Sequence, residues 1–541
     1  MLLHETFEDT VAASPDTEAL VCADQRYRYG QLQFMVERIA AVLQAQGVAR
    51  GDRVALVLPN GVEFIVACYA ALKVGAVFMP VNPAIKRDKL EYMLRDAEPA
   101  ALFMDARSFQ GYRELLDGLP GIRTRVLCGD REEDADDACT LSFSRAILGP
   151  EMPVRPVPVI DQDLAAIIYT SGSTSDPKGV MLTHLNMVSA SASIISYLGL
   201  RPDDNILCVL PLSFDYGLYQ VIMAFRVGAK VTLERSFTFP IAALETMAFE
   251  RITVLPGVPT IFSILCSMSV LPSYDLRALR LITNTGAALS ARHIQEIRSA
   301  FPQALLYSMY GLTECKRVSY LPPEELDRRP DSIGRGMPNE EVYLVNDAGV
   351  RLPAGSTGEL VVRGSHVMRG YWRKAEETAA CLRAGPIPGE RLLYSGDLFH
   401  SDADGWLYFI GRRDDMIKSR GEKVSPREVE SILYGLEGVL EAAVVGVPDP
   451  LLGQAVKAFI VTRSGYAYTE RDVLRHCLAN LEGHMVPQVV VFVESLPKTT
   501  TGKISKRALT DSVLDIAVRA SSENQRMGSG VVLAALERGS D

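Results

Sequence analysis

Residues 164–180, LAAIIYTSGSTSDPKGV, join an apolar run to a loop of small polar residues. The run Leu164–Tyr169 is typical of a buried strand, and the loop that follows it ends at Lys178 and Gly179. Glycines let successive backbone N–H groups converge on one anion, hydroxyl groups add donors, and a lysine adds a mobile positive charge. The stretch therefore predicts a phosphate-binding loop, although its spacing differs from the GxxxxGK[ST] pattern of P-loop enzymes. The alternative is a flexible linker, which rarely follows a buried strand.

The segments on both sides of this stretch alternate between helical and strand patterns. Leu32–Gln44 and Glu63–Lys73 have the apolar spacing of amphipathic helices, whereas Val54–Leu58 and Val77–Val81 are short apolar runs that end at turn residues. Similar short apolar runs recur downstream, at residues 205–210, 229–233, 252–255 and 279–283. Strands that alternate with helices favour an α/β fold with doubly wound parallel sheets.

The pattern changes twice toward the C-terminus. Between Glu341 and Gly364 two strands lie close together, which predicts a small antiparallel or β-barrel-like subdomain. After residues 411–415 comes a compact alternation of two helices and three strands, typical of a small α+β domain. We therefore expect a large N-terminal domain, a small C-terminal domain and a tail, over residues 1–412, 415–510 and 511–541.

Composition narrows the class of protein. The 541 residues are 48% hydrophobic and 23% charged, and the net charge of −10 gives no general reason to bind nucleic acid or an anionic membrane. The nine cysteines form no CxxC pair, which is typical of reduced thiols. The sequence has neither the apolar core of a signal peptide nor a run of about 20 apolar residues. We expect a cytoplasmic protein that binds neither membranes nor nucleic acid.

Seven further segments stand in a fixed order after the loop. They are YGLTE at 310–314, GEL at 358–360, YSGD at 394–397, GW at 405–406, GRRDD at 411–415, KSRG at 418–421 and PKTTTGK at 497–503. Together with the loop they resemble the motifs of the adenylate-forming (AMP-binding) superfamily, which includes acyl-CoA synthetases, luciferases and the adenylation domains of nonribosomal peptide synthetases. The resemblance covers about residues 5–510. It implies that a carboxylic acid is activated with ATP as an acyl-adenylate, with release of pyrophosphate, and is then passed to a thiol.

The resemblance also assigns residues to the nucleotide. Tyr310 is similar to the aromatic residue that stacks on adenine, Asp397 to the carboxylate that accepts hydrogen bonds from the ribose, and Arg412 to a second ribose or phosphate contact. Thr313 resembles a phosphate-binding hydroxyl, and Glu314 the carboxylate that helps to hold Mg²⁺, a cation that prefers oxygen ligands. The full set implied to bind ATP is Thr170, Ser171, Gly172, Ser173, Thr174, Lys178, Gly286, Ala287, Ala288, Tyr310, Gly311, Asp397 and Arg412.

A lysine near the C-terminus carries the implied catalysis. Lys503 resembles the residue that neutralises developing charge when the carboxylate attacks the α-phosphate, and Thr313 and Glu314 are the other implied catalytic residues. Enzymes similar to this chain use the small domain in two poses, hinged at the residue that matches Asp414. The second pose withdraws the lysine, and Gly421 leaves room for the pantetheine arm that brings the thiol.

The segment PLSFDYG at 211–217 bears on the acid. Its Phe214-Asp215 pair is closer to amino-acid-activating domains than to many acyl-CoA synthetases. A carboxylate in an apolar pocket is costly unless it is paired, so a substrate ammonium is a natural partner for Asp215. The alternative is that Asp215 caps the N-terminus of the following helix. The resemblance thus favours a stand-alone ligase for an amino or imino acid (proline or a β-amino acid) that loads a carrier protein. An acyl-CoA synthetase for a fatty, aryl or other organic acid is the alternative.

Two basic residues follow Glu314 directly. Lys316 and Arg317 are expected to line the substrate site with Thr285. They could bind a second carboxylate or a polar group of the substrate, or they could pair with nearby acids such as Asp215. The sequence leaves both interpretations open.

Overall fold

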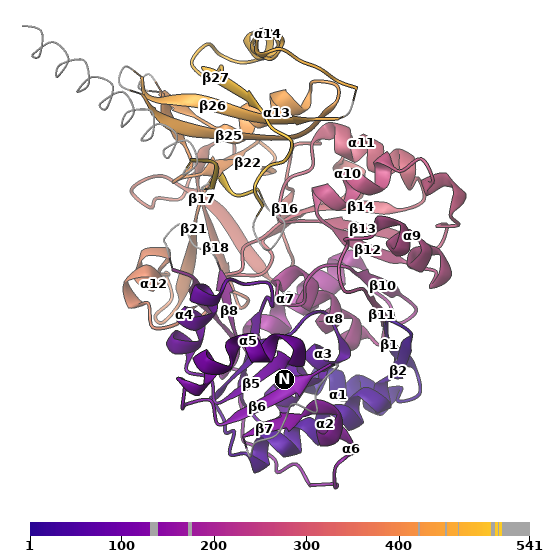
Figure 1. Ribbon diagram of the computed structural model, residues 1–541. Helices are drawn as coiled ribbons and strands as arrows, with labels where there is room; N and C mark the ends of the chain where they lie inside the picture. Colours follow the sequence, from indigo (N-terminus) through magenta and orange to yellow (C-terminus); the bar gives the residue numbers. More distant parts are fainter. Residues whose placement is uncertain are drawn as a thin grey trace, which may run out of the picture. The chain divides into compact units, whose positions relative to one another are not determined.

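The chain folds into two compact units, residues 1–409 and 410–541. The computed structural model describes residues 1–129, 139–170, 176–419, 422–449, 452–463, 465–498, 504–506 and 508–510. Figure 1 shows the chain coloured from its N-terminus to its C-terminus. The expected domain limits at residues 412 and 415 lie a few residues beyond the division between the units.

An eight-stranded sheet in the first unit holds the strand that leads into the loop. Its order is β19-β9-β8-β4-β3-β5-β6-β7, and the neighbours from β8 to β7 are parallel, whereas β9 and β19 are antiparallel additions. The strands are β3 (Arg53–Val57), β4 (Val77–Val81), β5 (Ala101–Asp105), β6 (Thr124–Cys128), β7 (Thr140–Ser142), β8 (Leu164–Thr170), β9 (Lys178–Thr183) and β19 (Gly370–Tyr371). The predicted strands at residues 54–58, 77–81 and 164–169 are confirmed.

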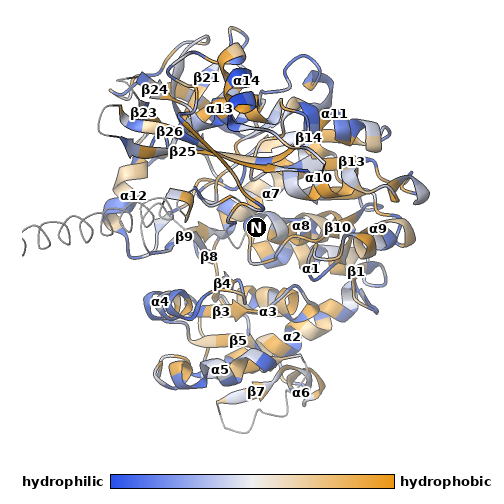
Figure 2. Cartoon of the chain, turned by 45° about the horizontal axis from the view of Figure 1, so that its top comes forward, coloured by the Kyte–Doolittle hydropathy of each residue, from blue (hydrophilic) through white to orange (hydrophobic). Residues whose placement is uncertain are grey.

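Helices follow the strands of this sheet and bury their apolar sides. They are α2 (Tyr29–Ala45), α3 (Val62–Lys73), α4 (Arg87–Ala97), α5 (Ala106–Asp117) and α6 (Phe143–Leu148). Nearly all of α3 is buried, whereas α4 buries only its apolar side. Figure 2 shows β3 and β5 in the hydrophobic colour and hydrophilic residues along α4 and α5. The alternation that the sequence predicted thus arises from a layered α/β arrangement.

A nine-stranded sheet completes the core of the first unit. Its order is β16-β15-β14-β13-β12-β10-β11-β1-β2, and it is parallel from β14 to β1. Its strands are β1 (Glu18–Cys22), β2 (Gln25–Arg28), β10 (Asn205–Cys208), β11 (Lys230–Leu233), β12 (Val254–Gly257), β13 (Leu281–Asn284), β14 (Leu305–Tyr310), β15 (Ser319–Leu321) and β16 (Arg335–Gly336). The helices between them are α7 (His184–Leu198), α8 (Asp215–Val227), α9 (Pro240–Phe249), α10 (Pro259–Ser267) and α11 (Ala291–Ala300), and α1 (Leu3–Ala13) contacts α8.

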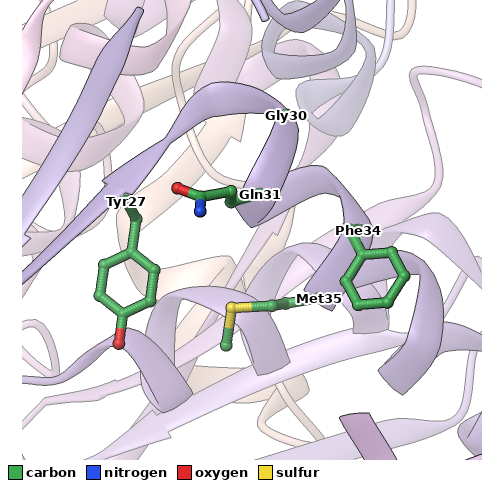
Figure 3. Close-up of a pocket in the computed structure, with 5 residues that line it drawn as sticks. All are labelled: Tyr27, Gly30, Gln31, Phe34 and Met35. Atoms are coloured by element: carbon green, nitrogen blue, oxygen red, sulfur yellow. The ribbon is translucent and has the colours of Figure 1, made fainter. Parts of the chain in front are cut away.

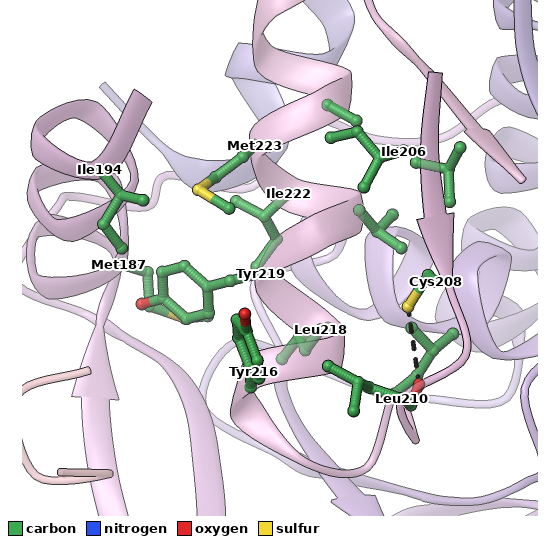
Figure 4. Packing of buried hydrophobic residues seen from close by; sticks show 14 of the residues in the cluster. Met187, Ile194, Ile206, Cys208, Leu210, Tyr216, Leu218, Tyr219, Ile222 and Met223 are labelled. Atoms are coloured by element: carbon green, nitrogen blue, oxygen red, sulfur yellow. Dashed lines mark hydrogen bonds between the residues drawn. The ribbon is translucent and has the colours of Figure 1, made fainter. Parts of the chain in front are cut away.

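Helix α8 is buried over almost its whole length. In Figure 4 the side chains of Tyr219 and Met223 turn toward Met187 and Ile194 of α7, and the Cys208 thiol lies 3.5 Å from the carbonyl oxygen of Leu210. Burying an apolar side chain of this size stabilises a fold by about 1.5–3 kcal/mol. This packing fixes the N-terminal turn of α8, which carries Asp215.

A five-stranded sheet follows the two parallel sheets. Strands β17 (Glu340–Val345), β18 (Thr357–Gly364), β21 (Arg391–Ser401) and β20 (Leu382–Ala384) pair antiparallel in that order, and β22 (Leu407–Arg412) pairs with β21. The predicted change to an antiparallel subdomain is therefore confirmed.

The second unit is a small α+β domain. Its sheet has the order β24-β23-β26-β25, with β27 parallel to β26. The elements are β23 (Ile417–Ser419), β24 (Glu422–Val424), α13 (Pro426–Tyr434), β25 (Val439–Asp449), β26 (Gly453–Thr462), α14 (Glu470–Asn480) and β27 (Val489–Phe492). Ser425 and Thr469 cap the two helices by accepting hydrogen bonds from Glu428 N and Asp472 N. Every element predicted here between residues 426 and 492 is present.

Candidate functional site

The carboxyl ends of the parallel strands bring distant segments to one edge of the nine-stranded sheet. Asp215 follows β10, Thr285 follows β13, and Glu314 follows β14. Ligands of open α/β sheets bind at this edge, because the loops there converge beyond the strand ends. The topology thus gathers the predicted substrate-binding and metal-binding residues.

Glu314 contacts β19, which pairs with β9, the strand that follows the predicted phosphate-binding loop. The Tyr371 hydroxyl donates a hydrogen bond of 2.7 Å to Glu314 Oε1, and the backbone N of Met368 donates to the carbonyl oxygen of Glu314 at 2.7 Å. Tyr371 pairs with Val180 across β9 and β19, and Lys178 Nζ lies 5.4 Å from the centre of the Tyr371 ring. Tyr371 therefore connects Glu314 with Lys178.

Tyr371 is a site residue that the sequence analysis missed. Burial, followed by the charge of Glu314 and the hydrogen bond to it, raises the pKa of Tyr371. The phenol therefore stays protonated at neutral pH and donates to the carboxylate. No local pattern in RGYWR (369–373) could reveal a contact with a residue 57 positions away.

Glu314 fits a metal ion that takes one ligand from the protein and the others from phosphates and water. Among the described residues, no group of three or more His, Cys, Asp or Glu side chains could hold a metal ion. Mg²⁺ in nucleotide sites is held by one or two carboxylates, with phosphates and water completing its octahedron. Glu314, whose Oε1 is already oriented by Tyr371, has the character of such a single ligand.

Tyr310 and Asp397, the residues expected at adenine and ribose, are in direct contact. The Tyr310 hydroxyl donates a hydrogen bond to Asp397 Oδ2. The Phe399 ring packs edge-on against the Tyr310 ring, with 5.1 Å between the two ring centroids. Asp397 is buried, and its backbone N donates to Ser395 Oγ at 3.1 Å. Two residues 87 positions apart thus form one polar pair within the first unit.

The turn after β13 is built from small residues, so its backbone could lie close to a bound nucleotide, as predicted. Gly286 has a φ of +87°, which favours glycine, and Asn284 Nδ2 donates to the carbonyl oxygen of Ala287 at 2.9 Å. Thr285 is buried, whereas Ala287 and Ala288 are exposed. The small exposed side chains leave the backbone of this turn accessible.

The turn after β14 is equally tight. A Cβ on Gly311 would lie 2.3 Å from the carbonyl oxygen of Lys316, so only glycine lets residues 311–317 close in this way. Thr313 is half-buried in this turn, next to Glu314. Lys316 itself adopts a left-handed φ of +64°, which is uncommon for a residue with a side chain.

Asp215 is paired within the chain. Lys316 Nζ lies 3.5 Å from Asp215 Oδ2 and donates a hydrogen bond of 2.8 Å to the carbonyl oxygen of Asp215. Asp215 is 7% exposed and Lys316 4%. Of the two interpretations left open for Lys316, pairing with Asp215 is therefore confirmed.

The interpretation of Asp215 as a helix cap is wrong. The N-cap of α8 is Phe214, which makes no side-chain cap hydrogen bond, and Asp215 is the first helical residue. The backbone N of Phe214 donates to the carbonyl oxygen of Pro211 at 3.0 Å, so the preceding turn already fixes where the helix begins. Phe214 itself is partly buried and packs against the core.

Burial lowers the pKa of Lys316 to about 7. Asp215 acts against this shift, and Arg317 adds to it. The ammonium also lies 4.4 Å from the centre of the Tyr219 ring and 5.5 Å from that of Tyr216.

We expect this pKa to appear in the pH dependence of stability. Between about pH 7 and 10.5 the unfolded chain holds a proton on Lys316 that the folded chain has released, so Lys316 contributes a rise in the free energy of unfolding with pH, by at most about 1.4 kcal/mol per unit. Buried thiols such as Cys68, whose pKa is raised, contribute in the opposite direction in the upper part of this window, so the contribution of Lys316 is the difference between the wild-type protein and K316M. Below pH 7 the folded protein bears the full destabilisation. Denaturant unfolding at several pH values would test this. In K316M the rise should disappear, whereas in K89M, which lacks an exposed lysine of α4, it should remain.

Some predicted residues lie outside the described part of the chain. They are Ser171, Gly172, Ser173, Thr174, Gly421 and Lys503. Arg412 and Asp414 are exposed and belong to the second unit. At the edge of the loop, Thr170 Oγ1 donates a 3.5 Å hydrogen bond to the carbonyl oxygen of Lys178.

A surface hollow of about 360 Å³ lies at the start of α2. It is lined by Tyr27, Gly30, Gln31, Phe34 and Met35, shown in Figure 3. None of these residues is charged, and none belongs to the predicted site. The hollow offers neither a phosphate-binding group nor a catalytic one.

Comparison with known proteins agrees with the motifs. A model of AMP-binding enzymes matches residues 7–372, and a model of their C-terminal domain matches residues 428–503. An indoleacetate–CoA ligase of Aromatoleum aromaticum is 32% identical over 94% of this chain and 97% of its own. Tyrocidine synthase 3 of Brevibacillus parabrevis is 30% identical over 94% of this chain but only 8% of its own.

Solved structures show the same architecture. ATP-bound MatB from Rhodopseudomonas palustris is 29% identical and superposes with a TM-score of 0.85 over 95% of this chain and 100% of its own. Among the described residues, no helix combines the length and apolarity that a membrane span requires. From the two matched models and these relatives, the chain belongs to the AMP-binding enzymes, a family of adenylate-forming ligases that activate acids with ATP.

Proposed function

We propose that this enzyme joins a carboxylic acid to a pantetheine thiol, that of coenzyme A or of a carrier protein, through an acyl-adenylate. The observation that carries the proposal is the contact of Tyr371 with Glu314 beside Lys178. It supports a phosphate site with one oriented carboxylate and one lysine. Such a site could stabilise the negative charge that develops when ATP is cleaved between its α- and β-phosphates.

In the first step an oxygen of the acid attacks the α-phosphorus of ATP. The bond between this phosphorus and the oxygen that bridges to the β-phosphate breaks, and pyrophosphate leaves. Glu314 would hold Mg²⁺, which would shield the negative charge of the phosphates when bound. Lys178 and Thr313 would bind phosphate oxygens, Asp397 and Tyr310 would position the nucleoside, and Lys503 would neutralise charge at the α-phosphate.

In the second step the thiol sulfur attacks the carbonyl carbon of the acyl-adenylate. The carbon–oxygen bond to AMP breaks, and the thiol proton is released to solvent. We propose that residues 415–510 turn about Asp414 between the two steps and bring Gly421 to the pantetheine arm. Neither step needs a covalent bond to the enzyme, because positioning and electrostatic stabilisation supply the rate enhancement.

The pairing of Asp215 bears on which acid is used. The amino group of Lys316 already lies 3.5 Å from this carboxylate and donates to the carbonyl oxygen of Asp215, so a substrate amine is not required as the partner of Asp215. This contact favours acids that lack an amine, as in the acyl-CoA synthetase alternative. An amino or imino acid loaded onto a carrier protein is the second candidate, favoured by the Phe214-Asp215 pair and the likeness to tyrocidine synthase 3.

Acid-dependent exchange of pyrophosphate into ATP tests the first step directly. A panel should hold amino, imino and β-amino acids beside fatty, aryl and dicarboxylic acids. Thioester formation with free coenzyme A, or with a phosphopantetheinylated carrier protein, then identifies the acceptor. Exchange restricted to acids with an amine would overturn the preference for acids that lack one, and the absence of exchange with every acid would overturn the proposed function.

The variant Y371F tests the orientation of Glu314. It removes one hydroxyl that donates to a carboxylate, and a hydrogen bond to a charged group contributes about 1.5–3 kcal/mol. We expect kcat/KM for ATP to fall by about 10- to 100-fold and the Mg²⁺ concentration for half-maximal activity to rise. The matched control is Y29F, which removes a buried hydroxyl that donates at 2.7 Å to the carbonyl oxygen of Ala229. If the Mg²⁺ dependence of Y371F equals that of Y29F, Tyr371 has no role at the metal.

A further inference from the structure

We propose that the acid activated by this enzyme carries a second carboxylate, and that Arg317 binds it. This inference rests on the proposed adenylation of an acid at the same edge of the sheet. It names the chemical class of that acid as dicarboxylic.

Arg317 is a buried cation without an anionic partner among the described residues. Arg317 is 2% exposed, and its buried Nε has no hydrogen-bond partner. The guanidinium forms no ion pair with any residue that the structure describes. Its polar contact is with an aromatic face: the guanidinium carbon lies 5.3 Å from the centre of the Tyr216 ring. A stacked ring compensates for only part of the lost hydration.

An arginine cannot escape this situation by losing its proton, because a guanidinium stays protonated in proteins. A buried lysine or carboxyl group can become neutral instead, as the lowered pKa of Lys316 illustrates. A buried guanidinium is therefore costly unless an anion or other hydrogen-bond acceptors complete its site. The fork of N–H groups on arginine fits a carboxylate with two parallel hydrogen bonds.

Three carboxylates of the described chain that could be expected to serve Arg317 have other contacts. Asp215 is paired with Lys316, and Glu314 accepts a hydrogen bond from Tyr371. Glu340 is buried and accepts a hydrogen bond of 2.9 Å from the backbone N of Met337, and burial raises its pKa to about 9, so it carries no charge at neutral pH. None of them forms an ion pair with Arg317, so the described chain supplies no anion for it.

The position of Arg317 favours the acid rather than the nucleotide. Its neighbour Tyr216 follows Asp215 at the start of α8, and the Tyr216 hydroxyl donates at 2.8 Å to the carbonyl oxygen of Thr283. Tyr216 adjoins Asp215, and Thr283 lies two residues before Thr285; Asp215 and Thr285 are both assigned to the substrate. The residues assigned to adenine and ribose, Tyr310 and Asp397, are instead paired with each other.

Pyrophosphate exchange with matched acids tests the proposal. Malonate, succinate, glutarate and adipate would each be compared with the monocarboxylic acid of the same number of carbons, and aspartate and glutamate with 2-aminobutyrate and norvaline. We expect the wild-type enzyme to prefer at least one dicarboxylic acid over the matched monocarboxylic acid by about 100-fold. The monocarboxylic acid cannot form the buried charge pair with Arg317. R317M should abolish this preference, R317K should retain part of it, and neither should change the KM for ATP.

The fold of the variants is checked by thermal unfolding. R317M removes a buried charge that has no anionic partner in the described chain, so its Tm without ligand should not fall. R226M is the matched control, because Arg226 is a partly buried arginine that donates to the carbonyl oxygen of Val188 at 2.7 Å. R226M should keep the preference between acids.

Three outcomes would overturn the proposal. One is a wild-type enzyme that exchanges with monocarboxylic acids as well as with their dicarboxylic partners. Another is an R317M variant that keeps the wild-type preference. The third is a variant whose KM for ATP rises while its preference is unchanged, which would assign Arg317 to the nucleotide. In each case exchange with some acid would still support adenylation, whereas a lack of exchange with every acid would remove the proposed function itself.

Discussion

Replacing Lys503 with alanine should slow adenylate formation by about 100- to 1000-fold, the effect expected when one group that stabilises a charged transition state is removed. The lysine is proposed to act only while the carboxylate attacks the α-phosphate. The second step should therefore survive: thioester formation from a supplied acyl-adenylate should stay within a few-fold of the wild-type rate. Single-turnover assays of each half-reaction would measure the two effects separately.

The segment offers a matched control for this variant. Lys506 lies three residues further on, and its Nζ forms an ion pair of 2.7 Å with Glu430 within the second unit. K506A removes the same side chain from the same segment, so it should change neither half-reaction by more than a few-fold. Equal losses in both half-reactions of K503A would contradict a role confined to the first step.

The second large effect is expected for E314Q. The change removes the charge of the proposed metal ligand but keeps its size and an acceptor for the Tyr371 hydroxyl. Losing a charged contact at this half-buried position should cost about 2 kcal/mol or more, so kcat/KM for ATP should fall by at least 30-fold, and higher Mg²⁺ should restore part of the loss. The KM for the acid should change little. Initial rates over a grid of ATP and Mg²⁺ concentrations would separate these parameters.

Glu250 provides the control for loss of charge alone. Its side chain is 6% exposed, and it pairs with Lys230 at 3.1 Å in a network with Arg26, outside the predicted site. The activities of E250Q and E314Q would be compared at a temperature at which both variants are fully folded. If both variants lose activity in the same proportion, and Mg²⁺ rescues neither, the carboxylate of Glu314 has no specific role with the nucleotide.

The strands and helices could be predicted because short-range patterns determine them. The run Val77–Val81 is buried at all five positions and forms β4 with those bounds, and Glu63–Lys73 differs from α3 by one residue. In the second unit, Pro426 after Ser425 marks the start of α13. In each case the residues that specify the element are adjacent in the chain.

The contacts of the site could be predicted only in part. The resemblance gave Tyr310 and Asp397 their expected roles, but it gave no sign that the two side chains touch. Tyr371 was missed because its contact with Glu314 depends on the pairing of β19 with β9, which brings together segments about 190 residues apart. Such pairing is a property of the folded sheet, not of the local sequence.

The choice between partners for Asp215 depended on backbone geometry. The sequence allowed Lys316 to face either the substrate or Asp215, and two features of the turn after Glu314 determine the result. Gly311 lets the turn close, and the left-handed φ of Lys316 turns its side chain toward α8. These features are visible only in the structure.

The fate of a labelled oxygen tests the central claim most directly. With an acid labelled by ¹⁸O in its carboxylate, attack on the α-phosphorus makes one labelled oxygen the bridge of the acyl-adenylate, and attack of the thiol at the carbonyl carbon leaves that oxygen on AMP. We predict that mass spectrometry will find one ¹⁸O atom in the AMP released per thioester formed. Label in orthophosphate, with ADP as the nucleotide product, or AMP that carries no label, would contradict the account.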